Sequence, residues 1–126
     1  MAYHVGKAQF ARLVEESLAN MPQQFAEFLE EVPIDIRDRP SRKQLRSVGL
    51  KDDELLLGLY TGSSLADRSV EQSVRLPSVI FLFQEDIELV SDTEAELKEE
   101  VRTTVLHEIG HHFGLDEDDL DELGYG

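Results

Sequence analysis

The sequence predicts an α+β fold in which helices pack on a small mixed β-sheet. Apolar residues recur at helical spacing near both ends of the chain, and three short apolar stretches between them are typical of strands. The chain has 126 residues, of which 40% are hydrophobic and 31% are charged. This size and composition predict one globular domain over residues 1–126.

Two helices are predicted in the first quarter of the chain. Over residues 5–19, apolar side chains recur at helical spacing at Phe10, Leu13, Val14 and Leu18. Asn20 and Pro22 break this pattern, and Pro22 can open a second helix as its first residue. The buried stripe of the second helix is predicted to contain Phe25, Phe28, Leu29 and Val32.

Three strands are predicted in the middle of the chain. Residues 32–36 alternate between apolar and polar side chains, as a half-buried strand does, and Asp38-Arg39-Pro40 ends that strand. Residues 41–53 are polar, and residues 55–60 form an apolar run closed by Thr61-Gly62. After a predicted loop over 63–75, residues 76–83 indicate a third strand, entered through Pro77.

The last third of the sequence predicts a long helix and a short one. Ser91 and Glu94 match a capping box, so the long helix should begin near Asp92. Leu97, Val101, Thr104, Val105 and Glu108 follow one another at helical spacing, and Gly114 is a natural stop. The short helix should run from Asp116, as N-cap, to Leu123, with Leu120 and Leu123 turned inward.

The charge balance argues against anionic partners. The chain has 12 basic and 27 acidic residues, a net charge of −15, which repels nucleic-acid phosphates and anionic membranes. The one basic cluster, Arg37, Arg39, Arg42, Lys43 and Arg46, has no interleaved aromatic residues, so we interpret it as a solvated loop and helix start. No apolar run approaches the roughly 20 residues of a membrane span. We therefore expect no nucleic-acid and no membrane partner.

Two further features indicate a cytoplasmic protein. The first residues lack the basic start and apolar stretch of a secretory signal. The chain contains no cysteine, which fits a reducing compartment. Any metal site must therefore use His, Asp or Glu as ligands.

The strongest functional signal is the segment His107-Glu108-Ile109-Gly110-His111 on the predicted long helix. Histidines four residues apart lie on one helix face about one turn apart, close enough to share a metal ion. In zinc hydrolases with this arrangement, the carboxylate that follows the first histidine polarises the metal-bound water and moves its proton. We therefore expect one zinc ion per chain, with His107 and His111 as ligands and Glu108 as the catalytic base.

A third ligand is suggested by spacing alone. Gly114 lies three residues after His111, and Glu117 lies three residues after Gly114. This resembles the extended metzincin pattern, in which the glycine lets the chain turn so that a third ligand reaches the metal. Glu117 is the predicted ligand, while the nearby Asp116, Asp118 and Asp121 remain competitors. Alternatively, Glu117 is a solvated acid at the start of the last helix.

The rest of the metzincin pattern is missing. Metzincins place a methionine-containing turn after the third ligand, and this chain has methionine only at positions 1 and 21. The 12 residues after Gly114 also leave nothing to form the lower wall of a substrate cleft. In residues 57–62, 76–83 and 104–115, the sequence instead resembles a family of short bacterial proteins with a minimal zincin fold. That resemblance implies a metallopeptidase-like site with His107 and His111 as ligands and Glu108 as base.

Three functions follow from these features. The first is a zinc-dependent peptidase that hydrolyses peptides or unstructured polypeptides, and the second is a zinc-binding or interaction module with little or no turnover. The third is a metal-dependent endoribonuclease, because the spacing of positions 107, 111 and 117 resembles a bacterial ribosomal-RNA maturation family. That family has His at the third position and no Glu beside the first, so Glu108, Glu117 and the net charge oppose it. The oligomeric state is left open.

Two neighbouring features complete the predicted site. His112 points about 100° away from His111 around the helix, so it is expected to pack or support the site and not to bind the metal. In zincins, an edge strand above the active helix pairs with an extended substrate. Residues 79–83 are the candidate for that strand, with an ordinary core strand as the alternative.

Overall fold

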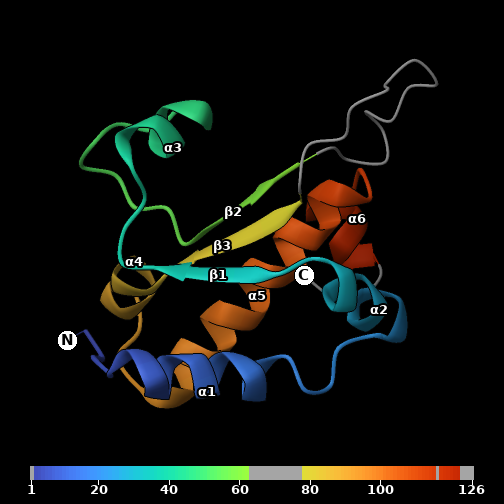
Figure 1. The fold of residues 1–126 in the computed structure, drawn as a ribbon, viewed down its shortest axis with the longest axis horizontal. Helices are drawn as coiled ribbons and strands as arrows, with labels where there is room; N and C mark the ends of the chain where they lie inside the picture. Colours follow the sequence, from blue (N-terminus) through green and yellow to red (C-terminus); the bar gives the residue numbers. More distant parts are fainter. Residues whose placement is uncertain (1, 63–77, 116, 123–126) are drawn as a thin grey trace.

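The computed structural model describes residues 2–62, 78–115 and 117–122, and for residues 117, 120 and 121 it describes the backbone only. The helices are α1 (Lys7–Ser17), α2 (Gln23–Glu31), α3 (Arg42–Ser47), α4 (Gln84–Leu89), α5 (Glu94–His112) and α6 (Glu117–Glu122). The strands are β1 (Ile34–Arg37), β2 (Gly58–Thr61) and β3 (Val79–Phe83). The helices pack against a small mixed sheet, which confirms the predicted fold class (Figure 1).

The sheet has the order β1-β3-β2. β1 runs parallel to β3, with Ile34 opposite Ile80, and β2 runs antiparallel to β3, with Gly58 opposite Leu82. Because side chains alternate between the faces of a strand, this register places Ile34, Ile36, Ile80, Leu82, Gly58 and Tyr60 on one face. That face packs on α5.

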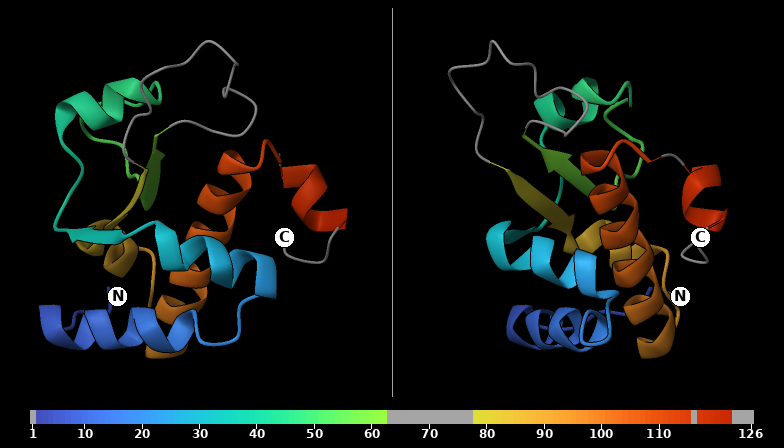
Figure 2. Two further views of the ribbon diagram at one scale, coloured as in Figure 1. Left: turned by 45° about the vertical axis from the view of Figure 1, so that its right-hand side comes forward. Right: turned by 90° about the vertical axis from the view of Figure 1, so that its right-hand side faces the viewer.

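Helix α5 is the central element of the core. It contacts the sheet through β2 and β3, and it also packs against α1, which lies beside β1 (Figure 2). Its side chains Leu97, Val101, Val105 and Ile109 are fully buried, as the helical spacing of the sequence predicts for the first three. The helix ends as predicted: Gly114 adopts a φ of 74°, and the N–H of Leu115 donates to the carbonyl of Gly110 at 2.7 Å. Among the helices of the described residues, none is long and apolar enough to cross a membrane.

Gly58 lets β2 approach α5 closely. A Cβ atom at this position would overlap the Cγ2 methyl of Thr104 on α5 and lie 3.0 Å from the carbonyl oxygen of Phe81. The glycine is therefore required by the packing of the strand against the helix that carries the histidines.

We expect Gly58→Ala to destabilise the protein by about 1–3 kcal/mol, because the added methyl overpacks the contact between β2 and α5. Adding Thr104→Ser removes the overlapping methyl and should recover most of the loss. Urea unfolding measures both effects. Gly6→Ala is the control, since its added Cβ meets no atom within 4 Å. Equal stability of Gly58→Ala and the parent protein would contradict this account of the packing.

Two short helices complete the list of elements. The predicted helix start in the basic cluster is confirmed by α3, which begins at Arg42 after a capping box between Ser41 and Gln44. Helix α4 was not predicted, because it follows β3 without any turn residue between Phe83 and Gln84. The prediction for residues 63–75 lies outside the described residues, as do Asp116 and the side chains of Leu120 and Leu123.

The start of α5 differs from the prediction. The N-cap is Thr93, whose hydroxyl oxygen accepts the N–H of Glu96 at 3.1 Å, so the predicted cap formed by Ser91 with Glu94 is wrong. Ser91 is fully buried, and its hydroxyl donates to the carbonyl of Ile87 at 2.8 Å. Ser91 and Thr93 each lie three residues before a Glu. Ser91 does not cap α5 because its N–H and its hydroxyl already donate to carbonyls at the end of α4.

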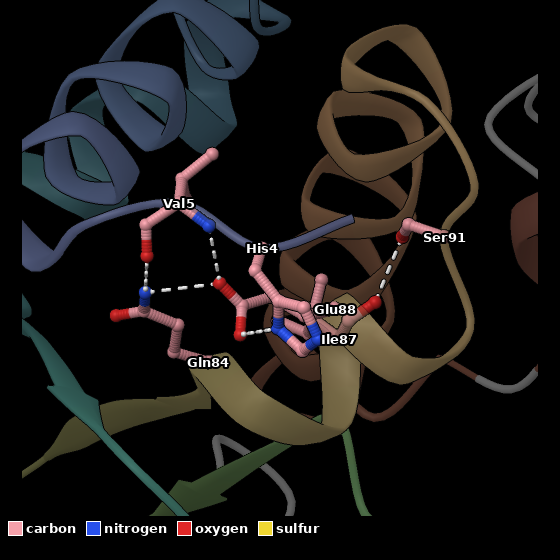
Figure 3. A network of polar contacts seen from close by, with 6 residues as sticks. All are labelled: His4, Val5, Gln84, Ile87, Glu88 and Ser91. Atoms are coloured by element: carbon pink, nitrogen blue, oxygen red, sulfur yellow. Dashed lines mark hydrogen bonds and ion pairs between the residues drawn. The ribbon is translucent and has the colours of Figure 1, made fainter. Parts of the chain in front are cut away.

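The polar side chains of α4 tie three distant segments together. Fully buried Asp86 accepts the Arg39 Nε at 2.9 Å and the backbone N–H of Leu56 at 3.0 Å. Buried Glu88 accepts the N–H of Val5 at 2.9 Å and lies 3.3 Å from the Nδ1 of His4 (Figure 3). These bonds hold the entrance to β2 and the segment before α1 against the same short helix.

Candidate metal centre

Helix α5 carries His107, Glu108 and His111 in its last two turns. The buried stripe from Leu97 to Ile109 fixes the rotation of this helix against the sheet, and so it fixes the direction in which the three polar side chains point. As residues i and i+4, His107 and His111 lie on one face of the helix about one turn apart.

The two histidines have different surroundings. His107 is half-buried, and within the described residues its imidazole takes part in no hydrogen bond or ion pair. The side chain of His111 is 64% exposed, and its Nδ1 lies 3.4 Å from Glu108 Oε1. Two imidazoles with so few competing protein contacts are available as nitrogen ligands for a metal ion.

Glu108 is buried between α5 and β2. The residue is 9% exposed, and its Oε1 accepts the backbone N–H of Tyr60 at 2.7 Å. Burial raises the pKa of Glu108 above its usual value, while the bond from Tyr60 and the nearby imidazoles of His111 and His107 oppose that rise. A carboxylate that is fixed in place and more basic than usual suits the role of a general base.

Tyr60 connects Glu108 to the interior histidine of the helix. Its hydroxyl lies 2.7 Å from the Nδ1 of His112 and 3.1 Å from the Oγ of Ser78. His112 is buried, and its ring centroid lies 4.4 Å from that of Phe28. The structure therefore confirms the packing role predicted for His112, and it shows that one residue of β2 contacts two polar side chains of α5.

We expect Tyr60→Phe to reduce stability by about 1 kcal/mol, because it removes the hydroxyl that bonds His112 but keeps the N–H that bonds Glu108. Thermal and urea unfolding measure the loss. Tyr3→Phe is the matched control, since among the described residues its hydroxyl contacts only Glu94, in a long and exposed hydrogen bond of 3.4 Å. If both variants lose the same amount, the buried contact to His112 contributes nothing.

Comparison with known protein families agrees with this geometry. The model of a zincin-like metallopeptidase family matches residues 29–126, which include the sheet and α5. The chain belongs to the zincin-like metallopeptidase family. No curated protein matches it.

The family relationship implies zinc, and the side chains of α5 suit that metal. Zinc in proteins is bound by imidazole nitrogen, carboxylate oxygen or thiolate, and this cysteine-free zincin-like chain offers the first two within one helix turn. In the part of the chain that the structure describes, no three His, Asp or Glu side chains gather as a complete metal site. A third protein ligand would have to come from elsewhere.

The predicted third ligand lies at the border of the described residues. Glu117 is the first residue of α6. Its side chain lies outside the part of the chain that the structure describes, as do Asp116 and the side chain of Asp121. Asp118 is exposed on the same helix. Helix α6 follows α5 after a short turn at Gly114 and contacts it, so the chain does turn where the glycine spacing predicts.

The edge strand beside the site is β2, and the candidate predicted for it is wrong. Residues 79–83 form β3, which is bonded to a strand on both sides, so the alternative of a core strand is confirmed. Tyr60 was not predicted as a site residue. Its only signal was its place in the segment 57–62, which supports the family resemblance.

Proposed function

We propose that this protein is a zinc-dependent peptidase in which His107 and His111 hold the metal and Glu108 is the general base. The observation that supports this proposal most is the position of Glu108, buried one residue from the first histidine and bonded to the edge strand at 2.7 Å. Zinc bound there would act as a Lewis acid that polarises a substrate carbonyl and lowers the pKa of water.

The chain's own residues supply the proton transfer. The Glu108 carboxylate takes a proton from the attacking water, and burial in the metal-free chain raises its pKa above that of a solvent-exposed glutamate. The N–H of Tyr60 keeps one carboxylate oxygen at a fixed place during this transfer. As a glutamic acid, the side chain then gives the proton to the leaving amine.

An extended substrate is proposed to lie along the outer edge of β2. The N–H of Phe83 donates to the carbonyl of Leu57. In an antiparallel pair every second residue bonds to the partner strand, so the backbone N–H and C=O groups of Gly58, Tyr60 and Gly62 point away from β3. Thr104 packs against Gly58 on the face of the strand, while Glu108 accepts the outward N–H of Tyr60 at the edge itself. The substrate backbone would therefore pair beyond that point, near Gly62, with its reacting carbonyl beside α5.

Hydrolysis of an unstructured-peptide library, analysed by mass spectrometry, tests this function. We expect cleavage in the presence of zinc, loss of cleavage when a chelator removes the metal, and recovery when zinc is added back. Cleavage that survives complete metal removal would contradict the proposal. So would complete inactivity of the zinc-loaded protein.

A second function is a zinc-binding module with little turnover. It is favoured by the absence of a complete three-ligand group among the described side chains and by the 64% exposure of His111. Such a module would bind one zinc ion and unfold at a higher temperature with the metal, yet would cleave no peptide. The library experiment and a thermal melt with and without zinc separate the two functions.

A further inference from the structure

The last two turns of α5 carry two pairs of polar side chains. His107 and His111 form the first pair, and Glu108 and His112 form the second, each at the i, i+4 spacing that places its members on one helix face. The first pair is half-buried to exposed and contains the candidate metal ligands. The second pair is buried, with 9% of Glu108 and 6% of His112 exposed. The second pair therefore faces the interior of the protein beside the metal-binding face.

Both members of the buried pair contact the same residue of the edge strand. Glu108 Oε1 accepts the backbone N–H of Tyr60 at 2.7 Å, and the Nδ1 of His112 lies 2.7 Å from the hydroxyl of Tyr60. Tyr60 is thus held at its backbone and at the far end of its side chain, by two residues one helix turn apart. Contacts at both ends of one residue restrict the position of β2 along α5 and its rotation toward the helix.

The imidazole of His112 is itself held by aromatic packing. Its ring centroid lies 4.4 Å from that of Phe28 on α2 and 5.0 Å from that of Phe113 at the end of α5. The hydroxyl of Tyr60 also lies 3.1 Å from the Oγ of Ser78, immediately before β3. Because the imidazole is buried among these rings, its Nδ1 provides a fixed point for the tyrosine hydroxyl.

The position of Tyr60 determines where the general base and the substrate meet. The N–H of Tyr60 orients the Glu108 carboxylate, and Gly62, beside which the substrate is proposed to pair, lies two residues further along the chain. A general base must lie within hydrogen-bond reach of the proton that it takes, and a misplacement of about 1 Å can cost about 10²-fold in rate. A shift of Tyr60 should therefore slow hydrolysis although every metal ligand and the base are still present.

We propose that His112 is a positioning residue of the peptidase. By holding the hydroxyl of Tyr60, it keeps the N–H of Tyr60 on Glu108 and keeps the substrate-binding edge of β2 in place beside the metal ligands. It acts through Tyr60 and is not itself a ligand or a base. The effect on hydrolysis rests on the proposed function, whereas the hold on Tyr60 can be measured without any substrate.

Two substitutions of nearly equal size separate the hydrogen bond from the packing of the ring. In His112→Asn, the amide places an oxygen or an N–H close to the position of Nδ1, so it can still bond the hydroxyl of Tyr60. His112→Leu has a similar size and shape but cannot form this bond. Both variants lose the ring contact with Phe28, so a difference between them reports the hydrogen bond.

Amide hydrogen exchange in the metal-free proteins gives the first readout. We expect the ratio of the exchange rate at Tyr60 to that at Ile80 to be about tenfold higher in His112→Leu than in His112→Asn. Ile80 is the internal reference, because it is fully buried in the central strand and its N–H donates to the carbonyl of Pro33 at 3.0 Å. A general loss of stability would accelerate exchange at both amides and leave the ratio unchanged.

Hydrolysis by the zinc-loaded proteins gives the second readout. We expect kcat on a cleaved peptide to fall about tenfold in His112→Leu, and His112→Asn to recover most of this loss, with the same zinc affinity in both variants. Tyr60→Phe should lose about as much as His112→Leu, because it removes the same bond from the other side. The double variant of His112→Leu and Tyr60→Phe should lose no more than either single variant.

The outcomes distinguish this proposal from the proposed function. Equal kcat of His112→Leu and His112→Asn in an active enzyme, equal exchange ratios, or additive losses in the double variant would each overturn the role of His112. Inactivity of the parent protein would overturn the proposed function and the effect on hydrolysis with it, while the exchange ratio would still show whether His112 holds Tyr60. If His112→Leu fails to fold, Tyr60→Phe takes its place in both measurements, with the parent protein as reference.

Discussion

Replacing Glu108 with glutamine should lower peptide hydrolysis by about 10²–10⁴-fold, the usual contribution of a general base. Glutamine has nearly the same shape and still accepts the N–H of Tyr60, so the contact between α5 and β2 should survive. It cannot take a proton from water at neutral pH. Initial rates on a peptide that the zinc-loaded protein cleaves measure the effect.

The control for this variant is Glu99→Gln, on an exposed position of the same helix, which should keep the parent rate. The metal-free Glu108→Gln protein should also be at least as stable as the parent, because burial disfavours the charge that the substitution removes. Unchanged hydrolysis by Glu108→Gln would show that another residue is the base.

Asp86→Ala should have the largest effect on folding, with a loss of about 3 kcal/mol. The carboxylate of Asp86 is fully buried and accepts bonds from Arg39 and from the N–H of Leu56. Its removal leaves the arginine and the backbone donor without this partner, and it loosens the segment that leads into β2. Urea unfolding measures the loss of stability.

Glu85→Ala is the matched control for Asp86, because it is the exposed neighbour on the same helix and should change stability by less than about 0.5 kcal/mol. Asp86→Asn should lie between the two, since it keeps one acceptor oxygen. If Asp86→Ala is as stable as Glu85→Ala, the buried carboxylate does not hold the entrance to β2.

The helices and strands that bury an apolar stripe were predictable from the sequence. The spacing of Leu97, Val101 and Val105 predicts α5, and Gly114 predicts its end, because a helix must bury one face and must stop where a left-handed residue closes it. The alternation in 32–36 predicts β1 for the same reason. In these segments local pattern and tertiary packing agree.

Short elements and strand order were not predictable. Helix α4 has six residues and begins directly after β3, so no turn residue marks its start. The order β1-β3-β2 depends on which strands pair across the chain, and residues 79–83 carry no sign that they occupy the centre. The same holds for the site. The spacing within α5 predicts His107, Glu108 and His111, whereas Tyr60 contacts Glu108 because β2 pairs with β3 beside α5, which the sequence does not show.

Zinc stoichiometry tests the central claim, that the histidines of α5 form a metal site, most directly. Native mass spectrometry of the metal-free protein titrated with zinc should show one ion on the parent chain and one on Glu108→Gln. His107→Ala and His111→Ala should retain none at the same zinc concentration, while His4→Ala, on an exposed residue beside Glu88, should bind as the parent does. Equal zinc uptake by the parent and by both α5 histidine variants would contradict the account.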